Sequence, residues 1–269
     1  MDYSTEAFLA AFKRFSSRRG LPQCIYSDQG TTFRGAAPAI VGAVQSAQPD
    51  PDFQNFLAEN RITWNFIPPA APHFGGLWES GVRSVKHHLR RVIGAHTPTI
   101  EEFTTLLCQI EACLNSRPLS PLTDHSDDLA SLTPGHFLVG SKITAVPEPT
   151  LLNLNANRLG RWQLYQQMLE SFWKLWSSDY VTSLQQRSKW RSRHKPVRVG
   201  QLVLVRNENT PPTKWPLGRI VKCHPGKDGL IRVVSVRTAS TTLVRPLIKL
   251  AVLPVVHNDD TAGNGATSL

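Results

Sequence analysis

CIYSDQG, residues 24–30, is the stretch that decides the fold we expect for the first part of the chain. Its opening residues are apolar and its last four favour turns, a pattern typical of a short buried strand that ends at Asp28. Before it, residues 4–19 carry Phe and Leu at helical spacing, and after it we expect a helix at residues 52–60 and a strand at residues 62–67. Strand, helix and strand together predict an α/β layer.

Apolar spacing predicts three longer helices, at residues 77–93, 100–116 and about 158–184. In the first of them one face should pack, and that face carries Val82, Val85, Leu89 and Val92. The third has a broad aromatic face, which we expect to pack against the core or a second subunit rather than to bind a ligand. Prolines, among them Pro38, predict a loop between residues 30 and 51, and residues 117–157 should be mostly irregular.

Beyond residue 199 the apolar spacing changes to a period of two, which is typical of strands. Strands are predicted at residues 202–205, 218–221, 231–236 and 242–245. Short strands separated by turns predict a small all-β barrel. The expected organisation is an α/β region at residues 1–150, a helical connector at 151–188, a basic barrel at 189–256 and a disordered tail at 257–269.

The net charge of +10 belongs to one part of the chain. Residues 1–186 contain 15 Lys and Arg against 16 Asp and Glu, whereas residues 187–256 contain 15 against only Glu208 and Asp228. Charge of one sign at this density repels itself unless a polyanion neutralises it, which favours a nucleic acid as partner. A solvated basic surface without a ligand is the alternative.

Other classes of protein are disfavoured by what the sequence lacks. No apolar run approaches the roughly 18 residues of a membrane span, and the N-terminal residues do not resemble a signal peptide. The four cysteines are scattered, without a CxxC pair or a matching His spacing. We therefore expect an intracellular protein with no membrane partner, no small-molecule substrate, no disulfide framework and no zinc site.

Two acidic residues stand out by their position, Asp28 at a strand end and Glu79 at the start of a basic helix. Phosphoryl transfer on nucleic acids commonly uses two divalent metals about 3.5–4 Å apart, held by carboxylates. Spacing alone favours the ordinary alternative, in which Asp28 forms a turn and Glu79 is a helix-start acid.

The residues around these acids resemble the integrase of Bel/Pao-type retrotransposons, which forms the C-terminal region of the Pol polyprotein. IYSDQGTTF, residues 25–33, is similar to the motif around the second catalytic acid of retroviral-type integrases. WNFIPPAAPHFGGLWES, residues 64–80, looks like the segment that carries the third acid in the Bel/Pao group. The resemblance continues through residues 114–119, 132–140, 173–176 and 180–187 and into the tail.

This resemblance implies a truncated RNase H-like catalytic core, a helical connector and an SH3-like barrel. It implies that Asp28 and Glu79 are catalytic ligands of Mg²⁺ or Mn²⁺, and that Arg83, Lys86 and Arg90 contact DNA phosphates. The family's reaction is 3′-end processing followed by strand transfer, without a covalent enzyme intermediate. Gln29 and Thr32 stand where the motif usually has Asn, although both side chains can still form hydrogen bonds.

Two parts of the family pattern have no counterpart in these residues, the first catalytic acid and the upstream zinc-binding region. Asp2 is no substitute, because no strand precedes it. Two carboxylates should hold a metal pair poorly, so we expect no strand transfer by this polypeptide alone. The strand before Asp28 should also expose an unpaired edge, which favours aggregation or docking.

The basic tail should bind phosphates without reading bases. The expected contacts are Lys189, Arg191, Arg193, Lys195, Arg198, Lys214, Arg219 and Lys222. Trp190 and Trp215 suit base stacking and a place in the core or hinge equally well.

The leading hypothesis is therefore a DDE-type integrase region of a transposable element. Such a region is expected to bind element ends and target DNA and to form a homo-oligomer. It is expected to work in the nucleus, or in a cytoplasmic particle before nuclear entry. The alternative is a non-catalytic DNA-binding protein derived from a retroelement.

Overall fold

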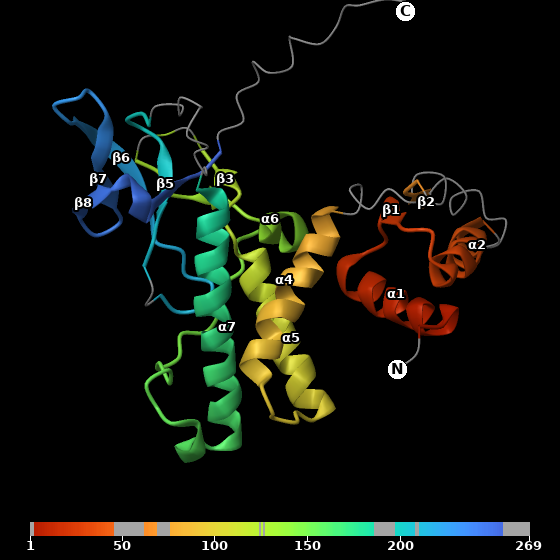
Figure 1. Ribbon diagram of the computed structural model, residues 1–269. Coiled ribbons are helices and arrows are strands. Elements are labelled where there is room, and N and C mark those ends of the chain that lie inside the picture. Colours follow the sequence, from red (N-terminus) through yellow and green to blue (C-terminus); the bar gives the residue numbers. More distant parts are fainter. Residues whose placement is uncertain are drawn as a thin grey trace, which may run out of the picture. The chain divides into compact units, whose positions relative to one another are not determined.

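The computed structural model describes residues 3–45, 62–68, 76–123, 125, 127–185, 197–207 and 210–254. The chain divides into two compact units, Met1–Ser84 and Val85–Leu269 (Figure 1). Helix α4 (Gly76–Ile93) crosses the division. The helix predicted at residues 52–60 and the predicted tail lie outside the described residues.

The first unit contains a parallel pair of strands, β1 (Cys24–Ser27) and β2 (Thr63–Phe66), in which Cys24 lies opposite Thr63. Helix α1 (Thr5–Arg19) precedes the pair, and helix α2 (Thr31–Gln45) follows β1. Since β1 ends at Ser27, the prediction that Asp28 follows a strand is confirmed, but the strand is not buried as expected, because Cys24 and Tyr26 are exposed and only Ser27 is buried. The parallel pairing agrees with the expected α/β layer, because parallel strands need a crossover connection between them.

Helix α2 lies where the prolines predicted a loop, so that prediction was wrong. Pro38 sits inside the helix. A proline removes one backbone hydrogen bond, but Ala36, Ala37 and Ile40 are all buried at helical spacing and bring α2 into contact with the rest of the unit. At Gly35 an added Cβ would lie only 2.6 Å from Thr5 Oγ1 of α1, so the contact with α1 depends on the missing side chain.

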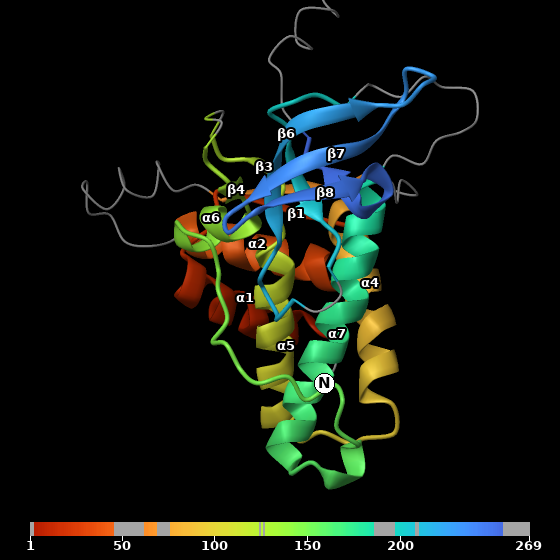
Figure 2. The same ribbon diagram turned by 90° about the vertical axis from the view of Figure 1, so that its left-hand side faces the viewer.

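The second unit is built on α5 (Ile100–Asn115) and α7 (Arg161–Leu184), which lie side by side (Figures 1 and 2). A short helix α6 (Pro134–Val139), a one-turn η2 (Ala156–Arg158) and two-residue strands β3 (Ser120–Pro121) and β4 (Ser131–Leu132) interrupt an otherwise irregular segment, largely as predicted. The aromatic face of α7 packs as expected from Tyr165 onwards, with Phe172 fully buried and stacked against Trp176, whereas Trp162 in the first turn, which was predicted to belong to this face, is exposed. None of the described helices is both long and apolar enough to cross a membrane.

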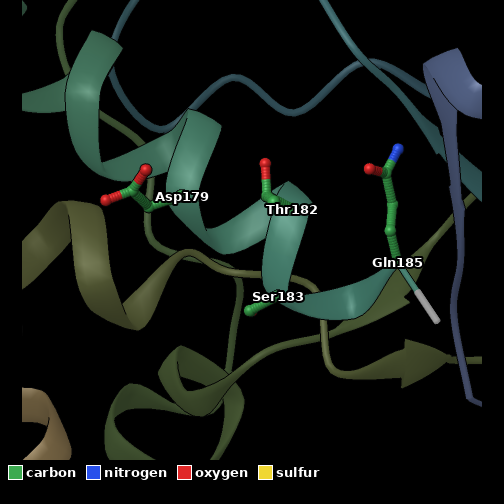
Figure 3. Close-up of a pocket in the computed structure, with 4 residues that line it drawn as sticks. All are labelled: Asp179, Thr182, Ser183 and Gln185. Atoms are coloured by element: carbon green, nitrogen blue, oxygen red, sulfur yellow. The ribbon is translucent and has the colours of Figure 1, made fainter. Parts of the chain in front are cut away.

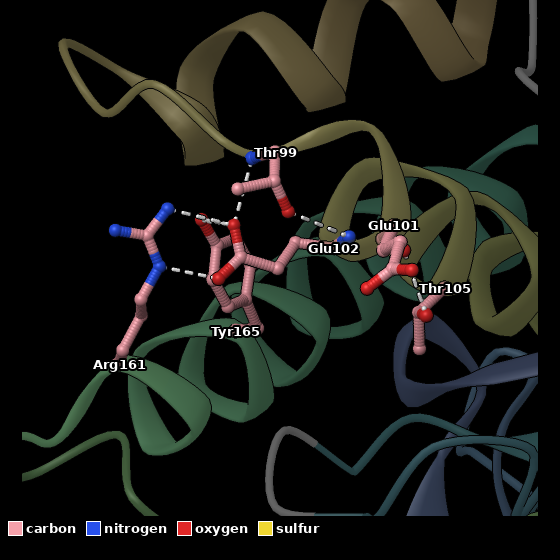
Figure 4. Close-up of polar contacts among 6 residues, drawn as sticks. All are labelled: Thr99, Glu101, Glu102, Thr105, Arg161 and Tyr165. Atoms are coloured by element: carbon pink, nitrogen blue, oxygen red, sulfur yellow. Dashed lines mark hydrogen bonds and ion pairs between the residues drawn. The ribbon is translucent and has the colours of Figure 1, made fainter.

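One carboxylate, that of Glu102, joins the start of α5 to the start of α7 (Figure 4). Thr99 caps α5 in a reciprocal capping box with Glu102. The same carboxylate accepts hydrogen bonds from Nε and Nη2 of Arg161, the latter at 2.8 Å, and from Tyr165 Oη at 3.0 Å. The bonds from Arg161 and from the Thr99 backbone hold the pKa of Glu102 far below its usual range.

The last part of the chain forms a five-stranded antiparallel sheet in the order β8-β7-β6-β5-β9. Its strands are β5 (Leu202–Val205), β6 (Leu217–Pro225), β7 (Ile231–Thr238), β8 (Thr242–Pro246) and β9 (Leu250–Val252), with the turn η3 (Leu247–Lys249) before β9. All four predicted strands are present, and β9 is an addition. Figure 1 shows the sheet beside the C-terminal end of α7, and β9 contacts that helix.

Strand β5 explains how the sheet and the helices are joined, because all four of its residues are buried. Leu202 and Leu204 belong to the core that α5 and α7 form. Val203 and Val205 face the opposite way, into a second core that the strands enclose. The segment predicted as a connector, residues 151–188, therefore shares one core with the sheet. The division between the two compact units falls between residues 84 and 85, inside the region predicted as one α/β domain at residues 1–150.

Candidate functional site

Asp28 lies immediately after β1, at the carboxyl end of the parallel pair, and its side chain is exposed. Its Oδ1 accepts a hydrogen bond from the Gly30 backbone N–H at 2.8 Å, which closes a tight turn into α2. Gln29 fastens this turn, because its Nε2 donates to Ile67 O at 3.0 Å and its Oε1 accepts from Arg34 Nε at 3.1 Å. The expectation that Gln29 can hydrogen-bond where the motif usually has Asn is thus confirmed.

Glu79 lies in the first turn of α4 and is partly buried. In the part of the chain that the structure describes, no group of three or more His, Cys, Asp or Glu side chains could hold a metal ion. Asp28 and Glu79 supply only two carboxylates, so the described residues do not fit a complete site for a metal pair. No catalytic step through a metal can be derived from them.

The second half of α4 has one packed face and one basic face. Val85 and Leu89 pack against the core of the second unit. Arg83, Lys86 and Arg90 are all exposed, as the helical spacing predicted. A surface helix with one basic face is suited to phosphate contacts, since each cation can neutralise one phosphate of a nucleic acid.

Two α4 residues behave differently from the prediction. Val82, expected in the packed stripe, is 52% exposed, because it precedes the part of α4 that joins the core of the second unit. His88, which apolar spacing did not single out, is 98% buried, with Nε2 at 3.3 Å from Asp179 Oδ2 and its ring edge-on to Phe172. Burial lowers the pKa of His88, and its Nδ1 has no hydrogen-bond partner among the described residues.

The predicted phosphate contacts of the sheet region fall into three groups. Arg198, Lys214 and Lys222 are exposed. The run predicted to lead into the barrel, which contains Lys189, Arg191, Arg193 and Lys195, lies outside the described residues. Arg219 forms the third group, because it is buried.

Arg219 does not lie at the surface where phosphate contacts were expected. Only 5% of it is exposed. Its Nη1 donates to Gly200 O at 2.7 Å and its Nη2 donates to Asp128 O at 2.6 Å. The guanidinium therefore fastens a distant turn to the sheet, a role that depends on a contact 91 residues away and leaves no local sequence signal.

Trp215 belongs to the core, which removes base stacking from the two alternatives. It is 7% exposed, and its ring lies edge-on to Trp173 with the centroids 4.8 Å apart. Its Nε1 donates to Ser116 Oγ at 3.0 Å. Trp190, the other candidate, lies outside the described residues.

Sequence reasoning missed three further arginines of the sheet, although the alternating pattern of β7 and β8 contains them. Arg245 is exposed, whereas Arg232 and Arg237 are engaged in ion pairs. Arg232 pairs with Asp228 in the turn before β7, at 2.6 Å, and Arg237 pairs with Asp127 at 2.7 Å.

A hollow of about 410 Å³ lies at the C-terminal end of α7, lined by Asp179, Thr182, Ser183 and Gln185 (Figure 3). Its polar groups already have partners within the protein. The Thr182 and Ser183 hydroxyls donate to backbone carbonyls of their own helix, and Gln185 Nε2 donates to the carbonyls of Ile248 in η3 and of Leu250 at the start of β9. Asp179 is paired with His88. The hollow therefore lacks the free convergent polar groups that a small-molecule site needs.

Comparison with known proteins relates the second unit to a family that has no assigned function. Residues 160–253, which cover α7 and the five-stranded sheet, match a "Family of unknown function (DUF5641)". No curated protein matches the chain.

Among solved structures, the chain is similar to a chain in the "CryoEM structure of simian T-cell lymphotropic virus intasome in complex with PP2A regulatory subunit B56 gamma". The TM-score is 0.32 and the sequence identity 11%, over 94% of this chain and 66% of that chain. This chain thus spans just under two thirds of the length of the chain it matches.

Proposed function

We propose that this chain is a DNA-binding region of a retroelement integrase of the Bel/Pao type. The observation that carries the proposal is the basic surface of the second unit and α4. Residues 197–254 contain ten Lys and Arg, all of them at least partly exposed except Arg219, and only two acidic residues. Helix α4 adds the exposed cations Arg83, Lys86 and Arg90. Neutralising phosphates releases counterions, which favours binding to any nucleic-acid sequence.

Two structural features support the assignment to the integrase type. Asp28 follows the first strand of a parallel pair and begins a tight turn, as the motif at residues 25–33 would require. The five-stranded antiparallel sheet encloses a core of its own, as an SH3-like barrel would, and the first unit would be part of an RNase H-like core. Both assignments rest on the sequence motifs together with these features.

The proposal separates DNA binding by this chain from catalysis by a complete integrase. The resemblance implies three acids and Mg²⁺ or Mn²⁺ at the site, and Asp28 with Glu79 accounts for two of the acids. DNA integration by end processing and strand transfer is therefore proposed for the parent protein, in the nucleus or a cytoplasmic particle and as a homo-oligomer. The hydrogen bond from the Gly30 N–H to Asp28 Oδ1 gives this carboxylate a structural part in the turn, and it favours the second candidate, a non-catalytic DNA-binding protein derived from such an element.

Binding is tested by fluorescence anisotropy with a labelled DNA duplex at increasing salt concentrations. We expect affinity to fall steeply with salt, as for a protein that contacts several phosphates. Replacing Arg83, Lys86 and Arg90 together by Gln should reduce the slope of log K against log salt by about 2.7, because each phosphate contact contributes about 0.9.

The matched control removes the same three charges from an exposed face of another helix. Lys13, Arg14 and Arg18 of α1 serve this purpose, since all three are exposed. The control should leave the salt slope unchanged within about 0.5. Failure of the wild-type protein to bind duplex DNA at low salt, or binding that does not respond to salt, would contradict the proposal.

Catalysis is tested separately, by incubating the pure chain with a labelled element end and a target plasmid in Mg²⁺ or Mn²⁺. We expect no strand-transfer product. A product that disappears in an Asp28→Asn variant would instead show that two carboxylates suffice, and would make this chain an active enzyme.

A further inference from the structure

The hairpin that joins β6 to β7 reaches past the other strands of the five-stranded sheet (Figure 2). Among the described residues, β5 pairs with β6 only at residues 217–219, and β8 pairs with β7 only at residues 233–237. The pairing of β6 with β7 continues beyond both, as far as Pro225 opposite Ile231. Residues 225–230 are all exposed. The end of the hairpin therefore projects from the sheet as two strands and a turn.

Three hydrogen bonds fix the shape of this turn. The Gly226 N–H donates to Leu230 O at 2.9 Å, and the Gly229 N–H donates to Gly226 O at 3.0 Å. Asp228 Oδ1 accepts a third bond from the Leu230 N–H at 3.1 Å. Both glycines are required, because Gly229 has a φ of +76° and a Cβ at Gly226 would lie 2.8 Å from Asp228 Oδ1. The turn thus has a defined shape before any partner binds.

The end of the hairpin carries a net positive charge, because its single acid is already paired. Asp228 accepts two hydrogen bonds from Arg232, at 3.0 Å from Nη1 and 2.6 Å from Nη2, and these bonds hold the pKa of Asp228 below its ordinary value. Lys222 and Lys227 are exposed and belong to none of the ion pairs found among the described residues. Two cations without an acidic neighbour favour contact with a polyanion.

Leu230 adds an apolar contact to this basic tip. It is 58% exposed. A single exposed leucine is ordinary on a protein surface, but this one lies on a fixed turn, between Lys227 and Arg232 in the sequence. The major groove of duplex DNA offers the complementary chemistry, since base edges with apolar thymine methyl groups lie between two rows of phosphates.

The dimensions of a hairpin select one groove of the duplex. The major groove is about 12 Å wide and admits a two-stranded β-ribbon, whereas the minor groove is about 6 Å wide. Two paired strands lie about 4.8 Å apart before their side chains are added, so the tip is too broad for an undistorted minor groove.

We propose that the tip of the β6–β7 hairpin, residues 225–231, enters the major groove of duplex DNA. Leu230 contacts the base edges there, and Lys222 and Lys227 contact the phosphates that border the groove. The inference rests on the proposed function, and it names the part of the DNA that this surface recognises.

The test compares the affinity of the full chain for two labelled duplexes of the same sequence. In one of them each cytosine carries a glucosyloxymethyl group at C5, which fills the major groove and leaves the phosphates and the minor groove unchanged. Wild type should bind this duplex about fivefold more weakly than the unmodified one, because Leu230 can no longer be buried against the bases.

Variants of the tip assign this difference to Leu230. Leu230→Asn should bind the unmodified duplex about fivefold more weakly than wild type at an unchanged salt slope, since it loses an apolar contact and no charge. It should bind the two duplexes within about twofold of each other. Leu154→Asn is the matched control, because Leu154 is 50% exposed in an irregular part of the same unit. It should stay within about twofold of wild type on the unmodified duplex.

A charge variant checks the phosphate contacts of the tip. Lys227→Gln should reduce the salt slope by about 0.9, the value of one phosphate contact. Lys142→Gln removes the same charge from an exposed position outside the sheet and should leave the slope unchanged. Thermal unfolding of each variant checks that the fold is intact, which the exposure of these side chains leads us to expect.

The outcomes separate the inference from the proposed function. If wild type binds the unmodified duplex with a steep salt slope and binds the modified duplex equally well, the inference is overturned and DNA binding stands. If Leu230→Asn keeps the wild-type preference for the unmodified duplex, another part of the chain enters the groove and the inference is again overturned. If wild type binds neither duplex, the proposed function fails and the inference fails with it.

Discussion

Trp215 provides the sharpest test of the packing in the second unit. It lies between β5 and β6 and is 7% exposed. Its ring centroid lies 4.8 Å from that of Trp173 and 5.4 Å from that of Tyr180, and its Nε1 donates to Ser116 Oγ. Trp215→Ala therefore removes a large side chain from the contact between the helices and the sheet.

The expected loss of unfolding free energy follows from these contacts. Truncating a buried aromatic residue to alanine costs about 3–5 kcal/mol. The lost hydrogen bond to Ser116 contributes about 1 kcal/mol, so we expect the upper end of that range, about 4–5 kcal/mol. For a unit of this size each kcal/mol lowers Tm by about 2–4 °C, which gives a decrease of about 8–20 °C.

Urea denaturation followed by far-UV circular dichroism measures the change, with thermal unfolding as a second measurement. Trp162→Ala is the matched control, because Trp162 lies on α7 but is 57% exposed. It should change the unfolding free energy by less than about 0.5 kcal/mol. If Trp215→Ala cost no more than Trp162→Ala, the shared core of helices and sheet would be refuted. Base stacking would then return as the role of Trp215.

Three further predictions concern groups that the fold holds in unusual surroundings. Burial lowers the pKa of His88, so below about pH 6.5 the folded state binds fewer protons than the unfolded state, and the stability that neutral His88 contributes above that pH is lost as pH falls. Urea denaturation should therefore give a lower unfolding free energy at pH 5 than at pH 7. This decrease should shrink in His88→Phe and persist in a variant of the exposed His87. Arg219→Met should lower the unfolding free energy by about 1–3 kcal/mol, since two carbonyls lose their donor. It should leave the number of phosphate contacts, and so the salt slope of DNA binding, unchanged. A reduced salt slope in a stably folded variant would show that Arg219 contacts DNA after all. The pKa of Glu102 lies far below its usual range, so the stability that its carboxylate contributes is fully present above about pH 4.5 and is lost only as the pH falls through that lowered pKa. At neutral pH, Glu102→Gln should speed amide hydrogen exchange at the first turns of α5 and α7. Unchanged exchange there would contradict the role of this carboxylate.

Local pattern was a good guide to the elements of this chain. Alternating apolar residues marked four of the five strands of the sheet, and helical spacing marked α1, α5 and α7. Turn-forming residues after an apolar run placed Asp28 at a strand end, where the structure has it. These predictions succeeded because each depends on residues close together in the sequence. The loop expected around Pro38 failed because the apolar spacing of Ala36, Ala37 and Ile40 outweighed the single proline.

The sequence by itself determined where most of the strands and helices lie and where the positive charge is concentrated. Metal binding by Asp28 and Glu79 stays a prediction. Only the tertiary structure decided which polar side chains leave the surface. Arg219 is buried where it binds a turn 91 residues away, and Trp215 is buried against aromatic side chains of α7, with its hydrogen bond to a serine 99 residues away. His88 is likewise buried against α7. Arg237 stays partly exposed, but its ion pair with Asp127 also joins residues that lie far apart in the sequence. Residue type and spacing record the local backbone preference, whereas burial depends on which distant segments the chain brings into contact, and no local pattern contains that information.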